Sequence, residues 1–171
     1  MKYFSGFSLT GEGELFREYI GDSGDFTVAG FSYGAIEAFE YVYNNKRRVD
    51  RLVLLSPAFF QTQKRSFIRA QLRYFDSDRE SYIKQFLINL SYPLESDTLS
   101  QYISVGERGE LEMLLNYHWD SKKLKELIER GITIEVYLGG EDKIINSQDA
   151  CDFFQDSSIV YYIKDVGHSL I

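Results

Sequence analysis

The sequence predicts an α/β fold, a mostly parallel sheet with helices on both faces. Short apolar runs that suit strands alternate along the chain with stretches of helical periodicity, which is the element order of parallel sheets with short crossovers. The run 51–55 is apolar after its first residue, as expected of a strand that is buried on both faces. The length of 171 residues suits a single domain with a substantial core.

Three strands and two helices are predicted in the first third of the chain. Residues 3–4 are a short apolar run that stops at a Ser-Gly pair, as expected of a first strand. Residues 13–20 carry their apolar side chains on one helical face, and a polar, glycine-containing stretch ends this helix. The apolar run 26–29 is the second strand and leads into a helix at 35–43. The run 51–55 is the third strand, which a Ser-Pro pair ends.

The rest of the chain predicts further helices and two more strands. The spacing of aromatic and aliphatic residues indicates helices at 67–75 and 82–87. Residues 121–130 place three aliphatic side chains on one face and stop at a glycine, which suits a helix C-terminus. The β-branched and aromatic runs 132–138 and 159–163 are strands, which brings the sheet to about five.

The stretch from about 61 to 118 lies between two predicted strands and is far longer than one crossover helix requires. We therefore expect a helical cap inserted at about 61–118 into a single domain whose core is formed by residues 1–60 and 119–171. The aromatic content of 16% suits either a filled core or the lining of a pocket.

Composition and charge exclude several classes of protein. The apolar content of 44% and charged content of 26% describe a folded globular chain. A net charge of -7 argues against general nucleic-acid binding. The one cysteine, Cys151, cannot form an internal disulfide, so we expect a cytoplasmic protein. The N-terminal residues lack an apolar stretch long enough for a signal peptide or a membrane span, and we expect no membrane association.

The segment Gly30-Phe31-Ser32-Tyr33-Gly34 directly follows the second predicted strand. Gly-x-Ser-x-Gly between a strand and a helix is typical of a nucleophile elbow, a strained turn that exposes the serine hydroxyl at the edge of a sheet. The glycines give the turn room beside the neighbouring strand and helix. Because short glycine patterns also occur by chance, the prediction depends on finding partners for Ser32.

A nucleophilic serine needs a base, and the chain has only two histidines. His168 follows the last predicted strand, at the same sheet edge as the elbow, and is the predicted base. The alternative interpretation of His168 is a surface residue near the C-terminus. His118 lies at the end of the inserted stretch and is the second candidate for the base.

The base in turn needs an orienting acid, and Asp142 follows the fourth predicted strand at its carboxyl end. Glu141 is the second choice. The chain order Ser, Asp, His is that of α/β-hydrolases. Four further acids are better interpreted as solvated helix or turn residues: Asp149, Asp152, Asp156 and Asp165.

Two backbone N–H groups should stabilise the developing oxyanion. One is that of Tyr33, which follows the nucleophile. The other is predicted in the loop after the first strand, where Phe7 is the expected donor and Gly6 allows close approach. The alternative is an ordinary glycine turn.

Together these motifs resemble those of a very short α/β-hydrolase, with the segments 3–7, 30–34, 139–143 and 166–169 carrying the resemblance. The chain is similar to the pimeloyl-acyl carrier protein methyl ester esterases of biotin synthesis, above all to the compact BioV type. The resemblance implies a truncated α/β-hydrolase fold with a helical cap. It also implies hydrolysis of the methyl ester of pimeloyl-acyl carrier protein without metal or organic cofactor. Compared with the full fold, we expect the first strands and the closing helix to be missing, and no clear strand is predicted between Phe7 and Phe26.

Basic residues in the insertion suggest how the carrier protein is bound. Residues 61–75 contain Lys64, Arg65, Arg69 and Arg73 but no acid. The three arginines are spaced i, i+4 and i+8, so a helix places them in one stripe that suits an acidic carrier protein. The alternative is a solvated helix face.

Two other functions remain compatible with the sequence. A thioesterase or a general short-chain carboxylesterase would use the same three side chains. A catalytically silent module that binds carrier protein would keep the fold without the chemistry. In each case we expect a monomer.

Overall fold

The computed structural model describes residues 1–21, 24, 26–94 and 96–171 of the chain. Its sheet has five strands in the order of the sequence, and every neighbouring pair is parallel. The predicted α/β fold with five strands is therefore confirmed. Residues 22, 23 and 25, in the predicted break after the first helix, lie outside the described residues. The strands are β1 (Lys2–Phe4), β2 (Thr27–Phe31), β3 (Arg51–Leu55), β4 (Thr133–Gly139) and β5 (Ile159–Ile163).

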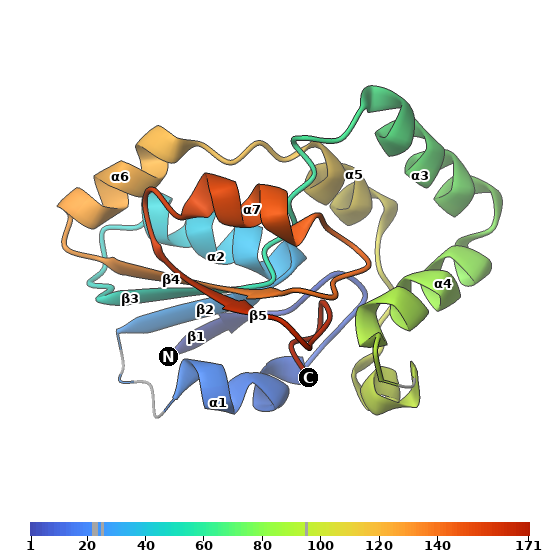
Figure 1. Ribbon diagram of the computed structural model, residues 1–171, viewed down its shortest axis with the longest axis horizontal. Coiled ribbons are helices and arrows are strands. Elements are labelled where there is room, and N and C mark those ends of the chain that lie inside the picture. The colour runs from blue at the N-terminus through green and yellow to red at the C-terminus, as the bar shows by residue number, and fades with distance from the viewer. Residues whose placement is uncertain (22–23, 25, 95) are drawn as a thin grey trace.

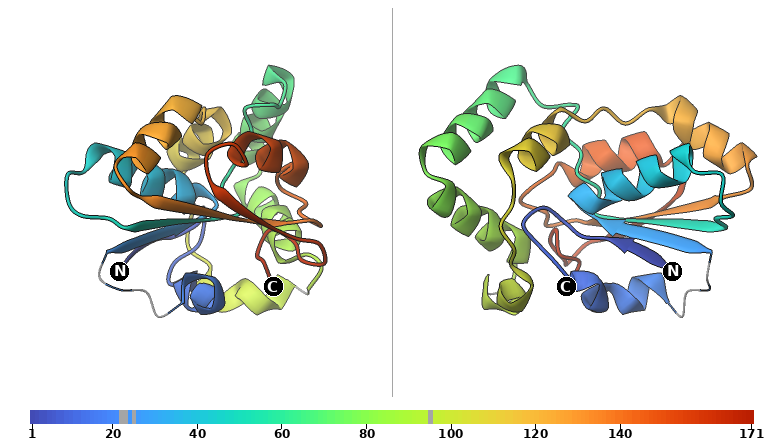
Figure 2. Two further views of the ribbon diagram at one scale, coloured as in Figure 1. Left: turned by 60° about the vertical axis from the view of Figure 1, so that its left-hand side comes forward. Right: turned by 180° about the vertical axis from the view of Figure 1, so that it is seen from behind.

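Helices cover both faces of the sheet and one of its edges. In Figures 1 and 2, α2, α6 and α7 lie on one face, α1 lies on the other, and α3, α4 and α5 extend beyond the edge at which the strands end. The helices are α1 (Arg17–Ile20), α2 (Tyr33–Asn44), α3 (Arg65–Ser77), α4 (Arg79–Ser91), α5 (Arg108–Asn116), α6 (Ser121–Glu129) and α7 (Ser147–Phe154), with 3₁₀ turns η1 (Glu12–Phe16) and η2 (Ser96–Tyr102).

Strand β3 separates two apolar cores. Leu52 and Leu54 pack into the core formed with α2, α6 and α7, whereas Val53 and Leu55 pack into the core that contains η1 and α1. Successive strand residues point to opposite faces, so a strand in the middle of a covered sheet is apolar at almost every position. This arrangement accounts for the unbroken apolar run from which the strand was predicted.

Several boundaries differ from the prediction for identifiable reasons. Strand β2 continues through Gly30 and Phe31 because both residues pair with β3, opposite Leu54 and Leu55. The first predicted helix starts as the 3₁₀ turn η1 and becomes α-helical only in α1. Helices α5 and α7 and the turn η2 have no counterpart among the predicted elements.

The segment between β3 and β4 carries α3, α4, η2, α5 and α6. Helices α3 and α4 pack through Phe75 and Tyr82, whose ring centroids lie 5.4 Å apart in an edge-on arrangement. Phe75 and Phe86 also contact the ring of Phe7, which lies in the loop after β1. Aromatic contacts therefore join these helices to the loop at the carboxyl edge of the sheet. No helix in the described residues is long and apolar enough to cross a membrane.

Candidate active site

Ser32 occupies a strained turn between β2 and α2. Its φ of 54° and ψ of -112° are unusual for a residue with a side chain. A Cβ atom at Gly30 would lie 2.0 Å from the Gly34 carbonyl oxygen, and one at Gly34 would lie 2.1 Å from the Phe4 carbonyl oxygen. Both glycines are therefore required by close backbone approach, as the elbow motif predicts.

Three predicted side chains come together at the carboxyl edge of the sheet. His168 Nε2 lies 2.9 Å from Ser32 Oγ, and His168 Nδ1 lies 2.6 Å from Asp142 Oδ2. The remaining carboxylate oxygen of Asp142 accepts the N–H groups of Ile144 at 2.7 Å and Ile145 at 3.0 Å. Because an ionised carboxylate only accepts hydrogen bonds, the Nδ1 of His168 carries the proton and Nε2 faces the serine hydroxyl.

The loops after β4 and β5 hold Asp142 and His168 in register. The Glu141 N–H donates to the Val166 carbonyl at 3.0 Å, which joins the two loops through their backbones. A Cβ atom at Gly139 would come within 2.6 Å of the same Val166 oxygen, so a side chain there would push the loops apart. The acid and the histidine are thus placed by backbone contacts rather than by their own hydrogen bond alone.

Burial shields this pair from water. The side chains of Asp142 and His168 are 1% and 0% exposed, and Ser32 is 4% exposed. The Phe31 ring lies 5.3 Å from the imidazole, centroid to centroid. A low local dielectric strengthens the interaction between the carboxylate and an imidazolium formed during a reaction.

Two backbone N–H groups near Ser32 are free of acceptors. Phe7 and Ser8 are the central residues of a turn that the Leu9 N–H closes on the Gly6 carbonyl at 3.1 Å. No described residue accepts a hydrogen bond from the Phe7 N–H or from the Tyr33 N–H at the start of α2. Phe7 and Ser32 both line the cavity described below.

The alternatives weighed from the sequence lie elsewhere. His118 is exposed and its ring lies 3.2 Å from the Trp119 carbonyl oxygen rather than near Ser32. Glu141 is exposed, and its backbone but not its carboxylate contributes to the loop contact. No hydrogen bond joins either side chain to Ser32 or His168 within the described residues.

The four basic residues singled out in the insertion lie at the start of α3 and along its solvent side. All are exposed, and none has an ion pair with any part of the chain that the structure describes: Lys64, Arg65, Arg69 and Arg73. The opposite side of α3 packs against the core through Phe75, with Ile68 and Leu72 partly buried beside it.

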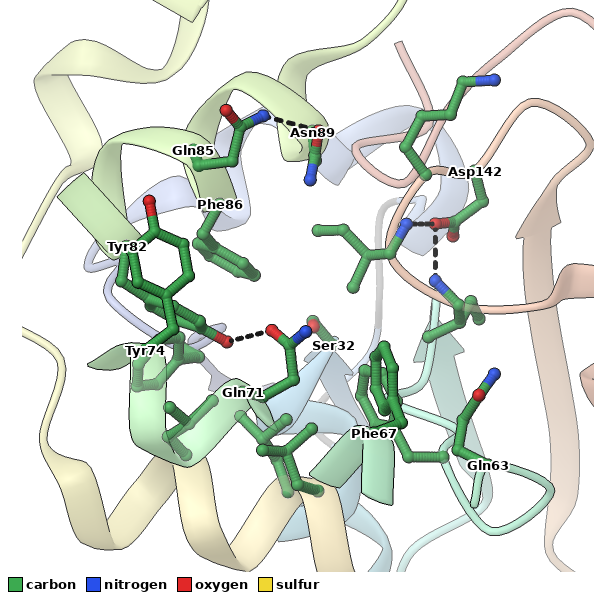
Figure 3. A pocket seen from close by; sticks show the side chains of 18 of the residues that line it. Ser32, Gln63, Phe67, Gln71, Tyr74, Tyr82, Gln85, Phe86, Asn89 and Asp142 are labelled. Atoms are coloured by element: carbon green, nitrogen blue, oxygen red, sulfur yellow. Dashed lines mark hydrogen bonds between the residues drawn. The ribbon is translucent and has the colours of Figure 1, made fainter. Parts of the chain in front are cut away.

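A cavity of about 570 Å³ opens above Ser32. In Figure 3, Tyr82 and Phe86 of α4 lie on one side of this cavity, Asp142 lies on the other, and Ser32 lies between them. The walls of the cavity are mainly aromatic and aliphatic. Burial raises the pKa of Tyr82 to about 12, so the Tyr82 hydroxyl keeps its proton and donates a hydrogen bond to Gln71. Polar groups in the wall are Gln63, Gln71, Gln85, Asn89, Lys143 and Asn146.

Sequence reasoning missed the carboxamides of the cavity wall, although a signal was present. Gln71 follows Phe67 by four residues and precedes Tyr74 by three, so the three side chains share one helical face. Gln85 and Asn89 are four residues apart on one face of α4 and are joined by a hydrogen bond of 3.1 Å. No group of His, Cys, Asp and Glu in the described residues is suited to hold a metal ion.

Comparison with solved structures shows the α/β-hydrolase fold. An esterase from Exiguobacterium antarcticum superposes with a TM-score of 0.69 at 16% identity, over 91% of this chain and 63% of that protein. BioG from Haemophilus influenzae gives a TM-score of 0.63 at 12% identity, over 98% and 87% of the two chains. A bromoperoxidase from Bacillus anthracis gives 0.64 at 16% identity, over 92% and 65%.

This chain thus spans less than two thirds of the Exiguobacterium esterase and most of BioG. No protein-family model and no curated protein matches the chain. The similar structures carry names of different activities, as expected of a fold that supports many chemistries. The comparisons therefore establish the fold, and the function has to be argued from the site.

Proposed function

We propose that this protein is a serine carboxylesterase. The observation that carries the proposal is the continuous hydrogen-bonded series Ser32, His168, Asp142, which ends at the base of a cavity. Nucleophile, base and orienting acid are then all in place, each buried and each held by backbone contacts.

In the proposed reaction, His168 removes the Ser32 proton as Oγ attacks the ester carbonyl carbon. The oxyanion accepts hydrogen bonds from the N–H groups of Phe7 and Tyr33. Collapse of the tetrahedral intermediate breaks the ester C–O bond, and the imidazolium protonates the departing alcohol. Water, deprotonated by His168, then hydrolyses the acyl-serine and restores the hydroxyl of Ser32.

We further propose that the substrate is the methyl ester of pimeloyl-acyl carrier protein, so that methanol is the alcohol released. The sequence resemblance to esterases of that kind motivates this assignment, and two features of the chain support it. The largely apolar cavity suits an extended acyl chain with its distal ester at Ser32. The exposed cations of α3, Arg65, Arg69 and Arg73, suit an acidic carrier protein.

Labelling with a fluorophosphonate tests the proposed chemistry directly. We expect a covalent adduct on Ser32 in the native protein and none in Ser32→Ala. A folded native protein that forms no adduct would contradict the esterase and support a silent binding module.

Substrate comparison then separates the esterases from one another. We expect faster hydrolysis of methyl pimeloyl-carrier protein than of the free methyl ester, with the thioester left intact. Equal rates on the two esters would indicate a general short-chain carboxylesterase. Release of the pimeloyl group from the carrier would indicate a thioesterase.

A further inference from the structure

Glu12 is a buried carboxyl group that the proposed mechanism does not use. It is 0% exposed, and its Oε1 accepts hydrogen bonds from the Gly6 N–H at 2.8 Å and from the Tyr3 hydroxyl at 3.0 Å. Its Oε2 has no partner, and no described cation pairs with it. Burial of a carboxyl group without a cation is costly, so its contact with the loop after β1 calls for an explanation.

The chain around Glu12 is shaped to turn this side chain inward. Gly11 has a φ of 75°, which lets the backbone reverse just before η1. Gly13 packs against the Tyr3 ring, and a Cβ atom at Gly13 would lie 3.2 Å from the nearest ring carbon. Burial and the neighbouring Glu12 carboxyl raise the pKa of Tyr3 far above its ordinary value, so Tyr3 stays a hydrogen-bond donor.

The bond to Glu12 occupies the N–H of Gly6, whereas the N–H of Phe7 is left without an acceptor among the described residues. The Gly6 N–H points at Glu12, and the Gly6 carbonyl accepts the Leu9 N–H, so both polar groups of Gly6 are used. In a turn of this kind the N–H of the second residue is not needed for closure. That residue is Phe7, whose ring is held by Phe75 and Phe86.

We infer that Glu12 is a positioning residue for oxyanion stabilisation, an inference that rests on the proposed esterase function. By accepting the Gly6 N–H, Glu12 fixes the orientation of the turn, and the Phe7 N–H is thereby presented to the cavity above Ser32. The required property is a buried acceptor at Oε1, not a negative charge as such. Glu12 itself does not touch the reacting atoms.

The test compares variants at Glu12 in the hydrolysis of a p-nitrophenyl ester and in binding of a trifluoromethyl ketone. This ketone forms a tetrahedral adduct with a reactive serine. Glu12→Gln keeps an acceptor at the same reach, Glu12→Leu removes it, and Glu12→Asp withdraws it by one methylene. Glu14→Gln, on the exposed side of η1, is the matched control.

We expect Glu12→Leu and Glu12→Asp to lower kcat about 100-fold with KM changed less than about threefold, because one oxyanion donor is misplaced. Affinity for the ketone should fall in parallel, and Glu12→Gln should stay within about fivefold of the native protein in both measurements. If Glu12→Leu does not fold, the comparison of Glu12→Asp with Glu12→Gln still tests the positioning role of Glu12.

Two outcomes would overturn the inference: folded Leu or Asp variants with native kcat and ketone affinity, or a Gln variant impaired as strongly as they are. Absence of esterase activity and of Ser32 labelling in the native protein would instead contradict the proposed function. The two failures are therefore distinguishable.

Discussion

At the scale of single residues, Asp142 is the most tightly constrained member of the site. One carboxylate oxygen of Asp142 accepts hydrogen bonds from two backbone N–H groups, and the other accepts one from the His168 ring. These bonds fix both the position of the carboxylate and its role as a hydrogen-bond acceptor. An amide at this position could present an N–H to His168, which would place the imidazole proton on Nε2, facing Ser32.

We therefore predict that Asp142→Asn lowers kcat for ester hydrolysis by about 10³- to 10⁴-fold with little change in KM. Steady-state kinetics with a p-nitrophenyl ester would measure the loss. Glu141→Gln is the matched control, because Glu141 is the exposed neighbour and only its backbone contacts the loop after β5. Similar losses in both variants would contradict the assigned role of Asp142.

The residues of the hydrogen-bonded series could be predicted because their chemistry is rare and their places in the chain are restricted. Two histidines leave little choice, and only His168 follows a strand at the edge where Ser32 lies. Glu12 could not be predicted in the same way. It reads as one more acid of a polar turn, and only the folded chain shows that its side chain turns inward to the Gly6 N–H.

At the scale of elements, the elbow depends on how closely α2 approaches β1. A methyl group at Gly34 would meet the carbonyl oxygen of Phe4, and the backbone of β1, which is paired with β2, cannot move aside as a flexible side chain can. Gly109 in α5 is the opposite case, since a Cβ there would have nothing within 4 Å. Both glycines lie in the first turn or two of a helix.

We predict that Gly34→Ala destabilises the protein by at least about 3 kcal/mol, whereas Gly109→Ala stabilises it by about 0.5–1 kcal/mol through helix propensity. Chemical denaturation followed by circular dichroism would measure both free energies of unfolding. A Gly34→Ala variant as stable as the native protein would show that the elbow tolerates a side chain at this position.

A second element-level feature is the ion pair that joins the starts of β3 and β4. Arg51 donates two hydrogen bonds to Glu135, at 2.8 and 2.6 Å, and the Tyr137 hydroxyl donates a third. These bonds from Arg51 lower the pKa of Glu135 below its ordinary value of 4.5, with burial opposing them in part. The stability that Glu135 contributes is therefore present above the unfolded-state pKa and is lost as the pH falls through the lowered folded-state pKa.

We predict that Glu135→Gln costs about 2 kcal/mol of unfolding free energy at pH 7, with a difference from the native protein that narrows below about pH 4. Urea denaturation at several pH values would measure it. Glu14→Gln, which breaks an exposed pair with Arg17, should cost less than about 0.5 kcal/mol at any pH. If Glu135→Gln lowered the free energy of unfolding equally at every pH, the stabilisation would not come from an ionised Glu135 carboxylate.

The strands could be predicted more surely than the helices of the insertion, for a physical reason. Residues 52–55 of β3 are apolar because both faces of the sheet are covered, whereas α5 has one core side and a glycine in its first turn. Its capping box, in which Glu107 and Glu110 bond each other's backbone, uses charged residues that also suit a loop. Tertiary packing rather than local sequence therefore determines that segment.

At the scale of the whole molecule, charge is distributed unevenly. The chain carries a net charge of -7, yet the solvent side of α3 exposes Arg65, Arg69 and Arg73 with no acidic partner among the described residues. An acidic carrier protein would be repelled by most of the surface and attracted here, which would orient its encounter with the cavity.

We predict that Arg69→Glu combined with Arg73→Glu raises KM for a carrier-bound methyl ester about tenfold and leaves kcat for a p-nitrophenyl ester unchanged. In the native protein, kcat/KM for the carrier-bound substrate should fall as salt is added, because screening weakens the attraction, and the double variant should lose this dependence. Lys122→Glu combined with Lys125→Glu is the matched control, since it changes the net charge equally on α6, away from α3 in Figure 1. An equal rise in KM for both double variants would mean that total charge matters and not the face of α3. No rise for either would mean that this stripe is only a solvated side of a helix.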